Sequence, residues 1–167
     1  MILDRRFAAL LILGWLVQIT VVPHIAIGRA MPDVILIVIA TYGFLEGPMP
    51  GSVAGIVGGF LQDLTLIRGF GINIINKTII GYLAGLVERN LFGSSRLIPM
   101  VAMFIVSVIS QLIYIALIYI VGDRIVVMTA IIEIVIPSAL YTSVVALFLF
   151  TPINRAMSHE RQETVFK

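Results

Sequence analysis

The segment from residue 97 to residue 122 reads LIPMVAMFIVSVISQLIYIALIYIVG and contains no charged side chain. An α-helix rises about 1.5 Å per residue, so about 20 apolar residues cross the roughly 30 Å hydrocarbon core of a bilayer. The segment is therefore long enough to span a membrane. Composition agrees, because 60% of the 167 residues are hydrophobic and only 12% are charged, whereas soluble domains average about 25% charged residues. We predict an all-α integral membrane protein.

The rest of the chain divides into further apolar segments, separated by short breaks that carry proline, glycine or charge. Such breaks mark the ends of transmembrane helices. The predicted spans cover about residues 7–27, 33–46, 50–66, 70–88, 97–122 and 125–151, and residues 152–167 form a polar tail. We therefore expect one membrane domain, a six-transmembrane-helix bundle. The uncharged core of the second span, VILIVIATYGFL, would be only about 18 Å long, so this span either crosses a locally thinned bilayer or stops part-way inside the bundle.

The basic residues predict how these spans are oriented. If both termini are cytoplasmic, seven basic residues lie inside and three lie outside, which follows the positive-inside rule. The inner set is Arg5, Arg6, Arg89, Arg96, Arg155, Arg161 and Lys167, and the outer set is Arg29, Arg68 and Arg124. The remaining basic residue, Lys77, lies within the fourth span.

Composition and motifs also exclude several functions. The basic residues are scattered singly and form no patch for nucleic acid, although the net charge is +2. Cysteine is absent, which excludes disulfides, thiolate catalysis and cysteine-ligated metals. The chain has no HExxH, GxSxG or P-loop motif. We therefore expect no enzyme activity, no metal and no cofactor.

Glycines recur every four residues in the third and fourth spans. The third span carries Gly51, Gly55 and Gly59 and then Asp63, whereas the fourth carries Gly69, Asn73, Lys77, Gly81 and Gly85. Residues at this spacing form a ridge along one side of a helix. Small residues on such ridges let two backbones approach closely, which is how helices associate in lipid. We predict a tight antiparallel hairpin that turns at about residues 67–69.

Ionisable residues inside a membrane need a partner or a function. Asp63 and Lys77 lie within reach of each other across the predicted hairpin, so the simplest interpretation is an ion pair that stabilises it. The alternative is a polar cavity that contacts a ligand or a partner protein. The residues that could converge on such a polar centre are Asp63, Asn73, Asn76, Lys77, Gln111 and Glu133. In that case two carboxylates would compete for one lysine.

Glu133 lies four residues before Pro137 in the last span. Proline has no N–H, so the Glu133 carbonyl loses its helical donor. We expect a kink in this helix.

One block of the chain, from about residue 32 to residue 90, has a recognisable pattern. Pro32 and Asp33 open a short apolar span, PGSVAGIVGGFLQDL follows, and LIRGFGINIINKTIIGYLAGLV comes next. This block resembles the MreD family of bacterial rod shape-determining membrane proteins. The remaining spans are similar to that family in length, number and hydropathy. The most recognisable positions are Asp63, Gly51, Gly55, Gly59, Gly71, Gly81 and Gly85.

The resemblance implies a non-enzymatic scaffold of the cell-elongation machinery in the bacterial cytoplasmic membrane. Proteins of this family work with MreC, a single-span periplasmic partner. They also work with the actin-like MreB, the RodA glycosyltransferase and its penicillin-binding transpeptidase to direct lateral wall synthesis. The family is similar in fold to the substrate-binding subunits of energy-coupling-factor vitamin transporters. Binding to the partner's helix could use close-packing glycine faces and a groove beside the short second span.

Two other functions remain open. A vitamin-binding importer subunit would suit an outward-facing polar centre, but such subunits carry small residues at four-residue spacing on the first helix. Here Ala8 is followed by Ile12, and Ala9 by Leu13, which favours the scaffold. A lipid-modifying enzyme would need acid–base geometry, for which only the six residues of the polar centre are available.

Overall fold

The computed structural model describes residues 5–65, 70–87, 97–122 and 127–165, with side chains described up to residue 157 except that of residue 127. Within these ranges the chain is helical and contains no strand. The elements are α1 (Arg5–Thr20), η1 (Val22–Ile25), α2 (Val34–Glu46), α3 (Pro48–Asp63), α4 (Ile72–Gly85), α5 (Leu97–Val121), α6 (Val127–Ala130), η3 (Ile131–Val135) and α7 (Ile136–Val165). The predicted hairpin turn at residues 67–69 lies outside the described residues.

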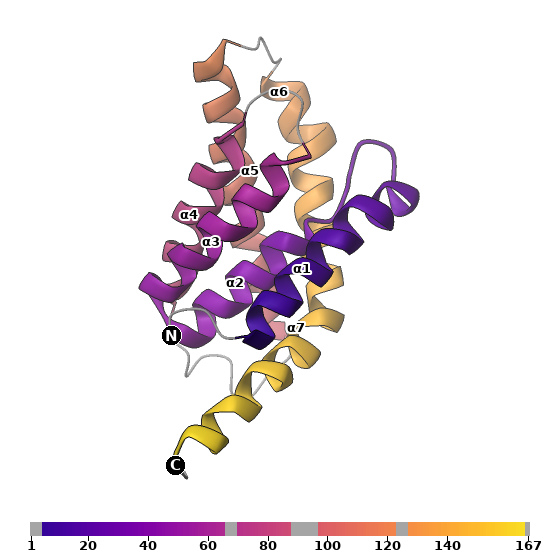
Figure 1. Cartoon of the computed structure of the whole chain (residues 1–167). Coiled ribbons are helices and arrows are strands. Elements are labelled where there is room, and N and C mark those ends of the chain that lie inside the picture. The colour runs from indigo at the N-terminus through magenta and orange to yellow at the C-terminus, as the bar shows by residue number, and fades with distance from the viewer. Residues whose placement is uncertain (1–4, 66–69, 88–96, 123–126, 166–167) are drawn as a thin grey trace.

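The helices pack into a bundle in which α1, α2, α3, α4, α5 and the last helix, which joins α6 to α7, run alternately in opposite directions (Figure 1). The start of α1 and the end of α7 lie towards the lower part of this view, and the connection between α1 and α2 lies towards the other end. Two helical stretches, Leu97–Val121 and Met128–Met157, are long and apolar enough to cross a membrane. The other apolar helices are shorter, and α2 has only 13 residues.

The short helix α2 lies in the middle of the bundle. It is apolar all round, and every one of its residues except the last, Glu46, is buried. A helix without a polar face is expected to be enclosed, and α2 contacts α1, α3, α4, α5 and α7. The surrounding helices therefore enclose most of α2, and the groove expected beside this span for a partner helix stays a prediction.

Helices α3 and α4 touch through their backbones, as the glycine spacing predicts. A Cβ atom added at Gly51 would overlap the Gly81 carbonyl, and one added at Gly55 would overlap the Lys77 carbonyl. Gly59 and Gly85 meet the opposite backbone in the same way. The two ridges therefore face each other inside the hairpin and are not open to a partner protein.

A third helix joins this contact through a glycine that the spacing analysis missed. A Cβ atom at Gly43 of α2 would lie 2.8 Å from the Gly81 carbonyl oxygen and 3.1 Å from the Gly85 nitrogen. Three backbones thus meet around Gly43, Gly51 and Gly81. The sequence carried a signal, because Gly43 and Gly47 continue the four-residue spacing of Gly51, but Gly43 is the one glycine within α2 itself.

The last helix is continuous from Val127 to Val165 and contains one wider turn. Residues Ile131–Val135 are π-helical, and the Ile136 N–H donates to the Ile131 carbonyl. The π turn ends two residues before Pro137, so it lies in the turn where the missing proline N–H interrupts the α-helical pattern. The interruption seen here is a π turn, and the kink itself stays a prediction. Beyond the predicted span, α7 continues through Pro152 to Val165.

Candidate functional site

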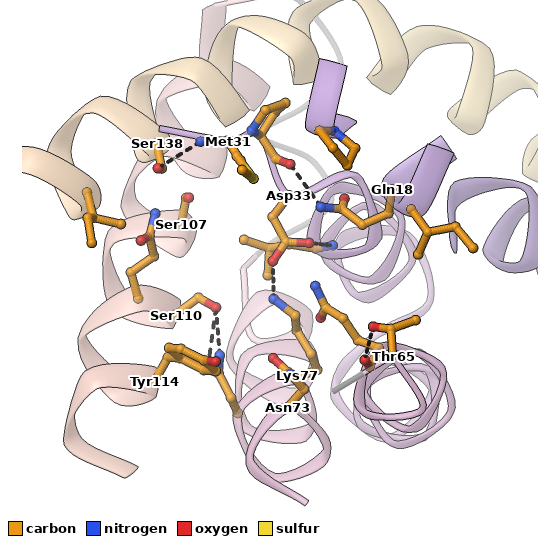
Figure 2. A pocket seen from close by; sticks show the side chains of 18 of the residues that line it. Gln18, Met31, Asp33, Thr65, Asn73, Lys77, Ser107, Ser110, Tyr114 and Ser138 are labelled. Atoms are coloured by element: carbon orange, nitrogen blue, oxygen red, sulfur yellow. Dashed lines mark hydrogen bonds and ion pairs between the residues drawn. The ribbon is translucent and has the colours of Figure 1, made fainter. Parts of the chain in front are cut away.

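A cavity of about 510 Å³ lies at the end of the bundle where α2 begins. Its wall comes from the last turns of α1 and α3, the connection before α2, the first half of α4, the middle of α5 and the start of α7 (Figure 2). Its polar residues are Gln18, Arg29, Asp33, Gln62, Thr65, Asn73, Asn76, Lys77, Ser107, Ser110, Gln111, Tyr114 and Ser138. Because α2 is only about 20 Å long, space remains beyond its first residue.

Lys77 pairs with Asp33 across this cavity. Its Nζ donates to Asp33 Oδ2, and only 2% of the Lys77 side chain is exposed, against 24% for Asp33. Asp33 is also the N-cap of α2, because its Oδ1 accepts the Leu36 N–H at 2.9 Å. The carboxylate is stabilised by the helix terminus and compensates the lysine charge at the same time.

The predicted ion pair between Asp63 and Lys77 is wrong. Asp63 is fully buried, and both of its carboxylate oxygens accept hydrogen bonds at the start of α4. Oδ2 accepts the N–H groups of Gly71 and Ile74 at 2.8 and 3.1 Å. Oδ1 accepts the backbone N–H and side-chain amide of Asn73 at 3.2 and 2.9 Å. Gly71 is the N-cap of α4 and offers no side chain, so Asp63 supplies the missing cap from α3.

Two asparagines of α4 link the cavity wall to its neighbours. The Asn73 amide is held by Asp63, whereas the Asn76 amide donates to Ser110 of α5 at 3.1 Å. Gln111 lies one residue further along α5, and its amide is 3.5 Å from the Val135 carbonyl at the end of the π turn. Of the six predicted polar-centre residues, Asn73, Asn76, Lys77 and Gln111 line the cavity.

Asp63 and Glu133 do not line the cavity. Glu133 accepts a hydrogen bond from Arg29 at 2.8 Å, in an ion pair whose side chains are 49% and 69% exposed. Arg29 lies in the connection before α2 and itself lines the cavity. The expected competition between Asp63 and Glu133 for Lys77 therefore does not arise, because a third carboxylate, Asp33, holds the lysine.

The connection before α2 is bonded to α7 and α1. Ser138 and Thr142 accept the backbone N–H groups of Met31 and Asp33 at 3.2 and 3.1 Å. Tyr141 donates its hydroxyl to the Ile25 carbonyl at 3.0 Å. The connection thus forms a fixed rim on one side of the cavity.

The same connection is held from α1 by Gln18. Its amide nitrogen donates to the Pro32 carbonyl at 3.3 Å, and its oxygen accepts the Val34 N–H at 2.7 Å. Gln18, Asp33, Ser107, Ser110 and Tyr114 are the principal site residues that the sequence analysis missed. Asp33 had a usable signal, since an acidic residue directly before an apolar helix is a typical N-cap.

The described residues contain no group of three or more histidine, cysteine, aspartate or glutamate side chains that could hold a metal ion. The cavity wall instead carries amide and hydroxyl groups and two basic side chains, Arg29 and Lys77, each paired with a carboxylate. Such groups can bind polar molecules by hydrogen bonding.

The model of the family described as rod shape-determining protein MreD matches residues 5–158 of the chain. This range includes all of α1 to α5 and most of the last helix. No curated protein and no solved structure gives a significant match.

Proposed function

The chain belongs to the MreD family of rod shape-determining membrane proteins, and on this premise we propose that it is a non-enzymatic scaffold of the bacterial cell-elongation complex. In this role it binds MreC and helps to direct peptidoglycan synthesis. Larger assemblies with MreB, RodA and a penicillin-binding transpeptidase follow from the same role. The observation that carries the proposal is the family match across residues 5–158.

The architecture supports a role in assembly. The glycine ridges and α2 are buried inside the bundle, so they fix its shape and are unavailable to a partner. The residues of α5 are mostly apolar, and only five of its 25 are buried. We propose that a partner's transmembrane helix contacts outward side chains of this kind, where shape complementarity in lipid provides the binding energy.

We further propose that the protein is a multi-pass protein of the bacterial cytoplasmic membrane with both termini in the cytoplasm. The bias of basic residues supports this orientation. The position of the start of α1 and the end of α7 towards one end of the bundle supports it as well (Figure 1). The cavity, at the other end, then faces the outside of the cell.

The proposal is tested by depleting the protein in a rod-shaped host and following cell shape by microscopy. If the protein is a scaffold of the elongation complex, we expect rounded cells, and we expect MreC to be lost from the elongation complex purified from them. Cells that stay rod-shaped after complete depletion would contradict the proposed role.

A pair of variants links this role to the fold. Gly59→Leu inserts a side chain into the backbone contact with Asn73 and Ile74, so we expect much less MreC to co-purify. Ser52→Leu adds the same side chain in α3 at a position that is not buried, and co-purification should be retained. Equal recovery of MreC with both variants would argue against a scaffold that depends on the hairpin.

The cavity favours one alternative, a substrate-binding subunit of an energy-coupling-factor importer. The exposed part of α1 speaks against it, because Ile12 and Leu13 are 52% and 61% exposed where such subunits present small residues. A vitamin that co-purifies in near-stoichiometric amount, from cells whose shape does not depend on the protein, would establish the importer role instead.

A further inference from the structure

The two cations that line the cavity already have opposite charges beside them. Lys77 pairs with Asp33 and is almost fully buried. Arg29 pairs with Glu133 at 2.8 Å. The Arg29 pair is largely exposed and adds little to the selection. At the buried end, a charged ligand would have to break the Lys77–Asp33 pair or remain uncompensated, and both are unfavourable. The charge balance therefore favours an uncharged occupant.

Two buried polar atoms on the wall have no hydrogen-bond partner within the described part of the chain. Ser107 is 1% exposed, and its Oγ has no partner among the described residues. The side-chain oxygen of Gln62 is also buried and unpartnered. Tyr114 adds a phenol to the same wall (Figure 2). Buried polar groups are nearly always satisfied, so unsatisfied groups that face a cavity indicate an occupant.

The unpartnered groups define the chemistry of that occupant. A hydroxyl such as that of Ser107 both donates and accepts, the Gln62 oxygen accepts, and Lys77 has further N–H donors beyond the one that Asp33 takes. A matching molecule must donate and accept hydrogen bonds at several positions while carrying no net charge. Several linked hydroxyl groups meet this requirement.

We propose that the cavity binds a neutral, hydroxyl-rich molecule of the saccharide type, either free or as the headgroup of a membrane lipid. Its volume of about 510 Å³ lies within the range of about 300–1,000 Å³ that small-molecule sites occupy. Leu36, Ile19 and Ile134 on the wall cover the C–H faces of a sugar ring. This binding does not depend on the proposed scaffold function.

The test uses the full-length protein in nanodiscs of a phosphatidylcholine that carries no sugar. Methyl α-glucopyranoside and N-acetylglucosamine serve as neutral probes, and glucuronate and glucosamine serve as anionic and cationic probes in isothermal titration calorimetry. We expect saturable binding of at least one neutral probe, with the charged probes binding at least about tenfold more weakly.

A second set of nanodiscs contains glucosyl diacylglycerol or plain diacylglycerol, and native mass spectrometry measures which lipid is retained. Retention of the glycolipid with no binding of the free sugars assigns the ligand to a headgroup.

Failure to saturate with any neutral probe up to about 10 mM, together with no preferential retention of the glycolipid, overturns the proposal and leaves water as the occupant. Tighter binding of glucuronate or glucosamine than of the neutral probes also overturns it.

Ser107→Ala provides a test at the site itself. The hydroxyl has no partner within the described protein, so its removal should not lower the melting temperature. It should, however, lower the affinity for the neutral probe by about tenfold. Thr41→Val is the matched control, because the Thr41 hydroxyl is also buried and unpartnered but lies off the cavity wall. We expect no change in affinity for this control. Equal affinities of Ser107→Ala, Thr41→Val and the unmodified protein would overturn the proposed site.

Discussion

The contact between α3 and α4 and the cavity beside α2 stabilise the bundle in opposite ways. In the hairpin, glycines bring two backbones together and no side chain intervenes. Around the cavity, the helices are linked by long polar side chains such as Lys77 and Gln18, which bond to other elements. The first region depends on the absence of side-chain atoms, whereas the second depends on their charge and hydrogen bonding. Substitutions should therefore act on the two regions by different physical routes.

The largest effect should come from one methyl group in the hairpin. Gly81→Ala places a Cβ atom against the Gly51 backbone, and neither helix can move without losing the whole contact. We expect a loss of more than about 4 kcal/mol in the free energy of unfolding, measured by denaturant titration in detergent. Gly14→Ala is the control, since its Cβ would lie at an ordinary 3.4 Å from Val38 and alanine is the better helix former. A Gly81→Ala protein as stable as the Gly14→Ala protein would contradict the backbone contact.

The next largest effect should follow from removing one member of the buried ion pair. Lys77→Met leaves the Asp33 carboxylate without its cation, and we expect a loss of about 3–5 kcal/mol in the free energy of unfolding. Adding Asp33→Asn to Lys77→Met removes the stranded charge and keeps an N-capping side chain, so most of the stability should return. Adding Asp63→Asn instead should give no recovery. If Asp63→Asn restored stability better than Asp33→Asn, the lysine would belong to Asp63 after all.

A smaller and more local effect is expected at Asp63. Asp63→Ala leaves four N–H groups at the start of α4 without their acceptor, and we expect a loss of about 2–3 kcal/mol, since some of these groups can rebond or reach water. Hydrogen exchange should accelerate at Gly71, Asn73 and Ile74 but not at Gly81. Uniform acceleration along α4 would show that Asp63 supports the whole hairpin and not only its cap.

The smallest effect should come from the exposed pair at the rim. Arg29 and Glu133 are largely exposed, so their coupling energy in a double-mutant cycle should be below about 1 kcal/mol. The coupling should fall towards zero at about 1 M salt, where charges are screened within about 3 Å. A coupling that persists at high salt would place this pair with the buried polar groups rather than on the surface.

The hairpin was predictable because its information is local. Gly51, Gly55 and Gly59 and their counterparts Gly81 and Gly85 recur at one fixed interval in two neighbouring segments, so geometry alone brings them face to face. The meeting of Asn73, Asn76, Lys77 and Gln111 at the cavity was expected for a related reason. Each lies on a helix whose depth in the bilayer can be estimated from its ends.

The pairing within the cavity was not predictable in the same way. Asp33 lies 44 residues before Lys77, and the two meet only because α2 packs at the centre of the bundle. Sequence distance favoured Asp63 as the partner, but the unfilled cap of α4 uses both oxygens of that carboxylate. Glu133 was wrongly placed in the polar centre for a similar reason. It pairs with Arg29 at the rim, and Arg29 lies in a connection whose sequence has no regular helical spacing.

Lys77 belongs to both regions, because its carbonyl lies against Gly55 while its ammonium group reaches Asp33. Any occupant of the cavity that moves this side chain therefore pulls on a residue whose backbone is clamped by the neighbouring helix. Such a backbone has almost no freedom to follow. The Lys77 backbone therefore stays in place when the cavity is occupied. We expect the occupant to fit the existing wall, so that selectivity comes from the occupant's shape and charge and not from closure of the protein around it.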